Sequence, residues 1–254
     1  MRLHVESVGR GPDLVLLHGW GLHSGAWNEV LPALAARMRV HAIDLPGHGH
    51  SANVEVRSFE EATDAVAALV PRGAVVCGWS LGGLIAQQLA HRHPDRVARL
   101  ALVATTPCFA ERPGWAHGMK AAVLTGFAEA LEADPETMLK RFVALNALHG
   151  PQGRDAVRAF TKRLLERGAP SEAGLAATLG WLREVDLRAQ AAGLQVPAVV
   201  LHGRRDMIVP VGAGRWLARN IAAARHIELG DAAHMPFFSH RDVFVTTIED
   251  LVVG

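Results

Sequence analysis

Cysteine is scarce in this sequence, and the two that occur, Cys77 and Cys108, form no Cys-x-x-Cys pair. A zinc cluster or a thioredoxin-like site is therefore not supported. Surplus charge is also missing, because 26 basic residues face 25 acidic ones, and this balance argues against nucleic acid as the main partner. Apolar runs stay shorter than the roughly 18 residues of a membrane-spanning helix. The first residues form no apolar signal segment either. We therefore expect a cytoplasmic protein that binds neither nucleic acid nor membrane.

Short apolar runs alternate with longer helix-like segments along the chain. Because most of these runs are rich in Val, Ile, Leu and Ala, they are typical of strands buried on both faces of a parallel sheet. Helices are predicted between them at residues 58–70, where Ser58 and Glu61 form a capping-box pattern, and at 81–93 and 243–252. This alternation predicts a doubly wound, mostly parallel α/β sheet. The expected strands cover residues 14–18, 39–44, 74–78, 100–103, 198–203 and 225–229.

One long stretch, residues 111–186, carries helix signals and no convincing strand. Asp134 and Pro135 have the residue types of an N-cap and a first helical position. We predict one helix from there to about residue 148 and another from 153 to 167. The sequence therefore predicts a helical cap at 111–186, inserted into a core made of residues 1–110 and 187–254.

The strongest chemical signal is Gly78-Trp79-Ser80-Leu81-Gly82-Gly83. It matches G-x-S-x-G, and a buried strand enters it while a helix leaves it, as in the nucleophile elbow of α/β hydrolases. The serine of such an elbow sits on a sharp turn, and the helix N-terminus places partial positive charge beside its reacting oxygen. Ser80 is therefore the candidate nucleophile.

A serine hydroxyl is a weak nucleophile until an imidazole takes its proton, and a carboxylate orients that imidazole. In this fold the order along the chain is serine, acid, histidine. Asp206 follows the strand at 198–203, and His234 follows the last strand. Asp231 competes with Asp206 for the acid, but it is too close to His234 in sequence to reach the far side of the ring easily. We predict a triad of Ser80, Asp206 and His234.

Negative charge that grows on a carbonyl oxygen needs fixed donors. We assign the main-chain amide of Leu81, next after the nucleophile, and that of Trp20 in His18-Gly19-Trp20-Gly21, the loop after an early strand. The turn at residues 44–51, which contains Asp44, is expected to be structural and to shape the rim of the site.

The chain resembles the pimeloyl-[acyl-carrier protein] methyl ester esterases of biotin synthesis. The resemblance spans nearly the whole chain, and the tryptophans of His-Gly-Trp-Gly and Gly-Trp-Ser-Leu-Gly-Gly narrow it beyond the general α/β-hydrolase fold. The segments that carry it are residues 14–22, 44–47, 78–84, 107–109, 141–145, 232–237 and 239–240.

The resemblance implies a carboxylesterase that hydrolyses the methyl ester at the free end of a pimeloyl chain held on acyl carrier protein. Carried over by position, it implies that the cap docks the acidic carrier through basic residues. It places substrate contacts at Trp20, Ser80, Leu81, Phe142, Val143, Ala144, Leu145, Asn146 and His234. The implied docking residues are Arg141, Arg154 and Arg158, while a further arginine of the family falls at Thr137.

The charge distribution supports this docking surface independently. Seven basic and two acidic residues lie between Thr137 and Gly168. Arg154, Arg158 and Lys162 are four residues apart, so a helix would place them on one face. We therefore add Lys162 to the docking residues, and we expect Lys140 and Arg163 to help it compensate for Thr137.

Alternative functions remain at this point. One is a general short-chain carboxylesterase or a carbon–carbon bond hydrolase on the same fold, and another is a ligand receptor that retains the fold. A haloalkane dehalogenase is disfavoured, because a serine stands where that chemistry needs a carboxylate. We expect no metal or organic cofactor, and we expect a monomer.

Overall fold

The computed structural model describes residues 2–147, 153–163 and 166–253. Its centre is a seven-stranded sheet in the order β1-β3-β2-β4-β5-β6-β7. All neighbouring strands run parallel except β1, which pairs antiparallel with β3. The strands are β1 (Val5–Val8), β2 (Asp13–Leu17), β3 (Arg39–Ile43), β4 (Ala74–Trp79), β5 (Val97–Val103), β6 (Ala198–Gly203) and β7 (Ala224–Leu229).

Each of the six expected strands is present, and β1 is the strand that the sequence did not predict. β1 lies at the edge of the sheet, and two of its four residues are exposed. A search for continuous apolar runs finds strands that are buried on both faces, such as β4, whose residues are all buried. It overlooks a short edge strand that contains Glu6 and Ser7.

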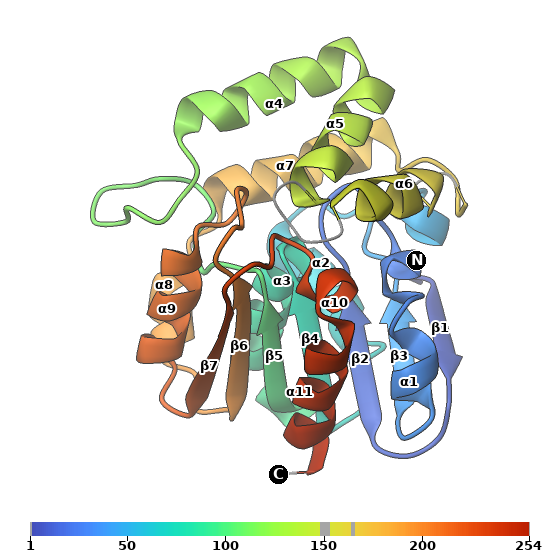
Figure 1. Ribbon diagram of the computed structural model, residues 1–254. Coiled ribbons are helices and arrows are strands. Elements are labelled where there is room, and N and C mark those ends of the chain that lie inside the picture. The colour runs from blue at the N-terminus through green and yellow to red at the C-terminus, as the bar shows by residue number, and fades with distance from the viewer. Residues whose placement is uncertain (1, 148–152, 164–165, 254) are drawn as a thin grey trace.

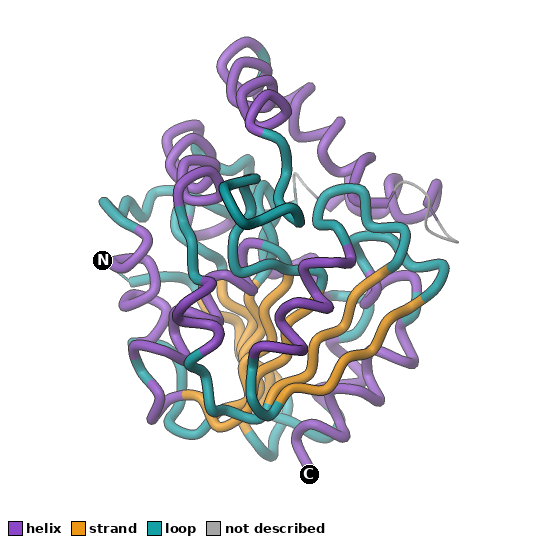
Figure 2. Tube along the Cα trace, turned by 90° about the vertical axis from the view of Figure 1, so that its left-hand side faces the viewer, coloured by secondary structure: helices purple, strands orange, loops and turns teal. Residues whose placement is uncertain are grey.

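Helices cover both faces of the sheet (Figures 1 and 2). On one face α2, α3, α8 and α9 form a continuous series, and α1 contacts α11 on the other. Ser58 caps α2 by accepting a hydrogen bond from the amide of Glu61 at 3.1 Å, as its position predicts. The helices of the core are α1 (Leu31–Ala35), α2 (Phe59–Ala67), α3 (Leu81–Arg92), α8 (Arg188–Ala192), α9 (Val211–Asn220), α10 (Pro236–Ser239) and α11 (Arg241–Val253).

Between β5 and β6 the described part of the chain forms four further helices above the carboxyl edge of the sheet (Figure 1). These cap helices are α4 (Ala121–Ala133), α5 (Pro135–Ala147), α6 (Gly153–Arg163) and α7 (Glu172–Glu184). Asp134 caps α5 by accepting from the amide of Thr137 at 3.0 Å. In the described part of residues 111–186 the chain forms isolated bridges but no strand.

The sequence places the ends of α5 and α6 at about residues 148 and 167. The expected end of α5 at residue 148 lies outside the described residues. The expected end of α6 at residue 167 was wrong, because α6 is described to Arg163 and residues 166–167 form a turn. Arg167 instead reaches Glu6 at 2.5 Å and Ser24 at 2.9 Å. These contacts fix Arg167 against the core, outside α6.

Among the described residues, no helix is long and apolar enough to span a bilayer. The apolar core is continuous from the sheet into the cap, where Leu124, Leu131, Phe142 and Leu175 are buried. The cap is therefore packed onto the core rather than tethered beside it.

Candidate active site

Ser80 stands between β4 and α3 in a strained conformation. Its φ of 54° and ψ of −117° lie where side-chain-bearing residues are rare. Two groups beside the end of β5 hold it there. The amide of Ser80 donates to the carbonyl of Val103 at 3.0 Å, and its carbonyl accepts from the hydroxyl of Thr105 at 2.7 Å. The surrounding structure thus maintains the sharp turn that presents the hydroxyl.

The glycines of the elbow let three main-chain segments meet. A Cβ on Gly78 would lie 2.3 Å from the carbonyl oxygen of Gly82, and a Cβ on Gly82 would lie 2.3 Å from that of Leu17. A real Cβ cannot approach so closely. The end of β2, and with it the loop that contains Trp20, therefore lies directly against the elbow.

His234 and Asp206 come together from loops after β7 and β6. Nδ1 of His234 lies 2.7 Å from Oδ2 of Asp206, and both side chains are buried. The other carboxylate oxygen accepts from the amides of Ile208 and Val209, each at 2.9 Å. The carboxylate is thus fixed by its own loop and aimed at the ring. This leaves Nε2 of His234 for a second partner.

Asp206 remains an anion despite its environment. Burial alone would raise the pKa of its carboxyl group. The charge interaction with His234 and the hydrogen bonds from His202 and His234 outweigh burial and hold that pKa below its ordinary value. An ionised Asp206 can accept a hydrogen bond from the Nδ1–H group of His234 and stabilise an imidazolium.

The rival acid has a different partner. Oδ1 of Asp231 lies 2.9 Å from Nε2 of His240, and Asp231 is exposed. His202, in contrast, is a neighbour of the triad that sequence reasoning missed. Its Nε2 lies 3.4 Å from Oδ2 of Asp206 and 2.9 Å from the carbonyl of Val209. Its position four residues before Asp206, at the end of a buried strand, was the available signal.

The structure does not contain a hydrogen bond between Ser80 and His234. Within the described residues Nε2 of His234 is buried and has no hydrogen-bond partner. Trp79, the residue before Ser80, links the elbow to the loop that contains His234, because its indole donates to the carbonyl of His234 at 2.8 Å. The rings of Trp79 and His234 are 5.6 Å apart. Catalytic hydrogen bonds are often long in unliganded enzymes.

Trp20 and Leu81 flank this site from two elements. Leu81 is the first residue of α3, where an amide has no acceptor within its own helix. Trp20 lies in the loop after β2, and its indole donates to the carbonyl of Leu175 in α7 at 3.1 Å. Both residues are fully buried, so a charge that develops between their amides would be shielded from water.

The cap segment at residues 142–146 also meets the site. The ring of Phe142 lies 5.0 Å from that of Trp20 in an edge-to-face arrangement. The carbonyl of Asn146 accepts from the amide of His234 at 3.3 Å. Val143 is buried, while Ala144 and Leu145 are half-buried. The two ends of this predicted segment therefore contact predicted site residues of the core.

The aromatic residues of the cap region divide into two groups. Phe127 lies 6.2 Å from Phe142 and so continues the apolar surface that starts at Trp20. Trp115 packs on Trp216, and Trp181 on Phe59, where they join cap to core. Phe127 and Phe142 are the better candidates for contact with an acyl chain.

The four predicted docking residues lie exposed on α5 and α6. Arg141 is on α5, and Arg154, Arg158 and Lys162 follow at helical spacing on α6. Lys140, which was expected to help, is already paired with Glu136 at 2.5 Å. Arg167 is likewise engaged by Glu6. Fewer basic residues are therefore available for docking than the count from the sequence suggests.

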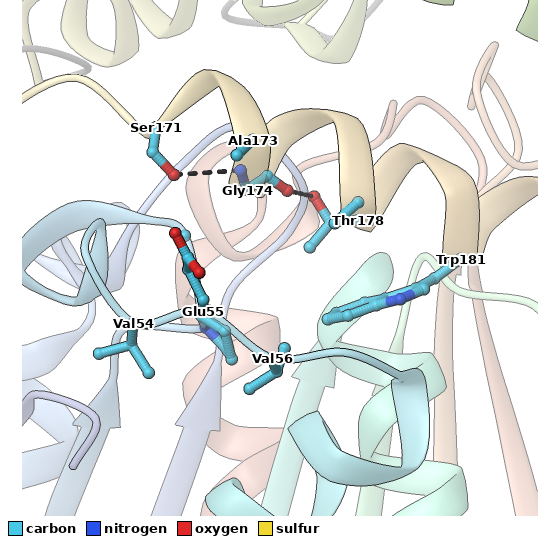
Figure 3. A pocket seen from close by; sticks show the side chains of 11 residues that line it. Val54, Glu55, Val56, Ser171, Ala173, Gly174, Thr178 and Trp181 are labelled. Carbon is cyan, nitrogen blue, oxygen red and sulfur yellow. Dashed lines mark hydrogen bonds between the residues drawn. The ribbon is translucent and has the colours of Figure 1, made fainter. Parts of the chain in front are cut away.

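A groove of about 260 Å³ lies where the cap meets the core, outside the triad (Figure 3). Val54, Glu55 and Val56 form one wall, and α7 forms the other with Ala173, Gly174, Thr178 and Trp181. Ser80 and His234 do not line it, and Ser80 is only 4% exposed. Among the described residues, no three His, Cys, Asp or Glu side chains are grouped to hold a metal ion.

Comparison with known proteins agrees with this geometry. Residues 12–241 match the model of the alpha/beta hydrolase fold family. The chain is 45% identical to the pimeloyl-[acyl-carrier protein] methyl ester esterase of Chromobacterium violaceum, over 98% of each chain. It is 42% identical to the enzyme of that name from Aeromonas hydrophila, over 99% of this chain and all of the other. A solved enol-lactonase from Burkholderia xenovorans superposes with a TM-score of 0.85 at 28% identity, over 99% of this chain and 96% of the other.

Proposed function

This chain belongs to the α/β hydrolase fold family and, within it, to the pimeloyl-[acyl-carrier protein] methyl ester esterases; we propose that it hydrolyses that methyl ester to pimeloyl-[acyl-carrier protein] and methanol in biotin biosynthesis. The fold class expected from the sequence is confirmed by the family match. The observation that carries the reaction is the buried contact of 2.7 Å between Asp206 and His234 beside a strained serine elbow.

In the first half of the reaction, Oγ of Ser80 attacks the carbonyl carbon of the methyl ester. Nε2 of His234, which has no other partner among the described residues, takes the hydroxyl proton. The carbonyl electrons move onto the oxygen, where the amides of Trp20 and Leu81 stabilise the negative charge. Asp206 balances the imidazolium that has formed.

The tetrahedral intermediate then collapses. Its bond to the methoxy oxygen breaks, and His234 returns the proton to that oxygen, so that methanol leaves and an acyl-serine remains. Water next attacks the acyl carbon while His234 takes one of its protons. The second collapse returns that proton to Ser80 and releases the free carboxylic acid, which loses its remaining proton to water and becomes the carboxylate. The cycle needs no oxidant, reductant or metal.

Residues 111–186 serve in this proposal as the cap that selects the substrate. The apolar surface of Trp20, Phe142 and Phe127 suits a methylene chain, which gains by leaving water. The exposed basic residues of α5 and α6 suit an acidic carrier protein. Arg141, Arg154, Arg158 and Lys162 are the residues assigned to this contact.

The test is methanol release from the carrier-bound methyl ester, with Ser80→Ala as the inactive variant. Release by the native chain and none by Ser80→Ala supports the proposal. Retained turnover in Ser80→Ala contradicts the mechanism. Equal efficiency on p-nitrophenyl esters and on the carrier-bound ester would favour a general carboxylesterase instead.

A further inference from the structure

Two fully buried histidines lie beside the loop that contains Trp20. His18 belongs to that loop, and His48 comes from the turn after β3. Their rings are 5.4 Å apart. The triad mechanism uses neither of them. Each nevertheless binds one of the two peptide groups that flank Trp20.

The hydrogen bonds of His18 fix its tautomer. The amide of Leu45 donates to Nε2 at 2.9 Å, so Nε2 must offer its lone pair. The proton is therefore on Nδ1, which donates to the carbonyl of Gly19 at 2.8 Å. That carbonyl belongs to the same peptide group as the amide of Trp20. Because the chain has no cis peptide bond among its described residues, the Trp20 N–H points away from the His18 ring.

His48 holds the next peptide group in the same way. The amide of Gly21 donates to its Nε2 at 3.1 Å. Nδ1 therefore carries the proton and donates to the carbonyl of Pro46 at 2.9 Å. On each side of Trp20, the rotation of the peptide group is thus limited by a histidine. Neither histidine can move without breaking two hydrogen bonds.

Both rings must stay neutral for this arrangement, and their surroundings keep them so. Burial lowers the pKa of His18 to about 3 and that of His48 to about 4, although Asp44 opposes this effect for both. Asp44 is itself engaged by the amides of Ser24 and His50. The Nε2 lone pairs are therefore available at neutral pH.

The same turn also supports the cap. The carbonyl of Gly47 accepts from the amide of Ser171 at 3.0 Å, and a Cβ on Gly47 would lie 2.4 Å from Cα of Gly174. The indole of Trp20 reaches Leu175 one residue further on. The loop that contains Trp20 is thus fixed between the elbow below it and α7 above it.

We propose that His18 and His48 are positioning residues that orient the main-chain amide of Trp20 for stabilising the oxyanion. The inference rests on the proposed function, in which that amide is a donor. Neither imidazole touches the substrate, and each acts through one peptide group. Substitution should therefore lower kcat more than it changes KM, because the ground state does not use the amide.

Substitution by asparagine or glutamine can test the two hydrogen bonds of each histidine separately. Asparagine places its NH₂ group near the position of Nδ1, and glutamine places its oxygen near that of Nε2. His18→Asn can keep the bond to Gly19, and His18→Gln cannot. At His48 the order is reversed, because glutamine can accept from Gly21 and asparagine cannot. The favourable replacement therefore differs between the two positions.

We expect His18→Asn and His48→Gln to retain kcat within about threefold, and His18→Gln and His48→Asn to lose about 10- to 100-fold, part of what removing an oxyanion donor costs. KM should change little in all four. Measured on p-nitrophenyl butyrate, which needs the amide but no carrier, the comparison stands even if the carrier-bound ester fails to react. That failure would instead refute the proposed substrate.

Equal kcat values within each pair, or losses of kcat that follow only the melting temperature, would overturn the inference. So would a preference for glutamine at both positions, because that result reports a better packing side chain and not a retained bond. Should one variant fail to fold, the pair at the other histidine decides the question alone.

Discussion

The turns at the carboxyl edge of the sheet and the helices of the cap hold their proposed site residues in opposite ways. In the turns, Ser80, Asp206 and His234 are at most 7% exposed, and main-chain groups fix each of them. On the cap, Arg154 and Arg158 are exposed on α6. Charges that stay in water interact weakly and are screened by salt.

This difference separates chemistry from recognition. A reacting group has to be held within a fraction of an ångström, which buried hydrogen bonds achieve. A docking surface has only to attract and orient a large partner, which exposed charges do at little cost in desolvation. Changes in the turns should therefore affect every ester, whereas changes on α6 should affect only the carrier-bound one.

The largest effect is expected for Ser80→Ala. Removal of the nucleophile should lower kcat by about 10⁴-fold or more on both the carrier-bound and a simple ester. Steady-state release of methanol and of p-nitrophenol measures the two rates. Ser7→Ala, on the distant edge strand β1, is the matched control and should keep its activity. A loss of activity on only one of the two substrates would contradict the expectation that changes in the turns affect every ester.

Asp206→Asn and Asp231→Asn form the next comparison. Both remove one carboxylate from a histidine, but only Asp206 contacts His234. We expect Asp206→Asn to lower kcat by about 10³- to 10⁴-fold, because the imidazolium loses its counter-charge and the ring its tautomer. Asp231→Asn should stay within about twofold. Similar losses in the two variants would contradict the assignment of the acid.

A smaller and more selective effect is expected on the cap. Replacing Arg154, Arg158 and Lys162 together by glutamine should raise KM for the carrier-bound ester by about 10-fold, with a rate on p-nitrophenyl butyrate that is unchanged. Arg10→Gln, at the opposite end of the sheet, is the control. Added salt should weaken the carrier-bound reaction in the native chain and much less in the triple variant. Equal salt sensitivity on both substrates would contradict the assignment of these residues to carrier docking.

The smallest effect concerns stability and pH. His18 and His48 have folded pKa values of about 3 and 4, below the ordinary 6.5. Below pH 6.5 the unfolded chain therefore binds protons that the folded chain does not, so the free energy of unfolding falls as pH drops towards 4. Each histidine contributes a slope of about 1.4 kcal/mol per pH unit there.

Urea unfolding at several pH values checks this slope. His48→Gln removes one titrating group. Between pH 6.5 and 4, its free energy of unfolding should therefore change less steeply with pH, by about 1.4 kcal/mol per pH unit, the contribution of one proton. An unchanged slope would show that His48 is not held neutral. The difference in slope between the native chain and His48→Gln isolates the contribution of His48 from that of the other groups that titrate in this range.

Most of the sheet was predictable, because strands such as β4 and β6 are buried on both faces and leave continuous apolar runs in the sequence. The elbow was predictable because close approach of the main chain demands Gly78 and Gly82. The order of serine, acid and histidine then identified Asp206 and His234 as partners. Local chemistry thus determined these features.

The remaining features depend on contacts between distant residues. Nothing near Arg167 indicates that Glu6 will pair with it, and nothing near His48 indicates that its ring will accept from Gly21. β1 is defined by its pairing with β3 and not by its composition. Such partners emerge only when the topology brings the segments together.

The most direct measurement follows the carrier-bound pimeloyl methyl ester by intact mass while methanol is assayed. We expect the native chain to remove one CH₂ from the mass of the loaded carrier and to release one methanol for each carrier converted. We expect Ser80→Ala to leave the carrier mass unchanged and to release no methanol. Conversion by Ser80→Ala at the native rate, or a loaded carrier that the native chain leaves intact, would contradict these expectations.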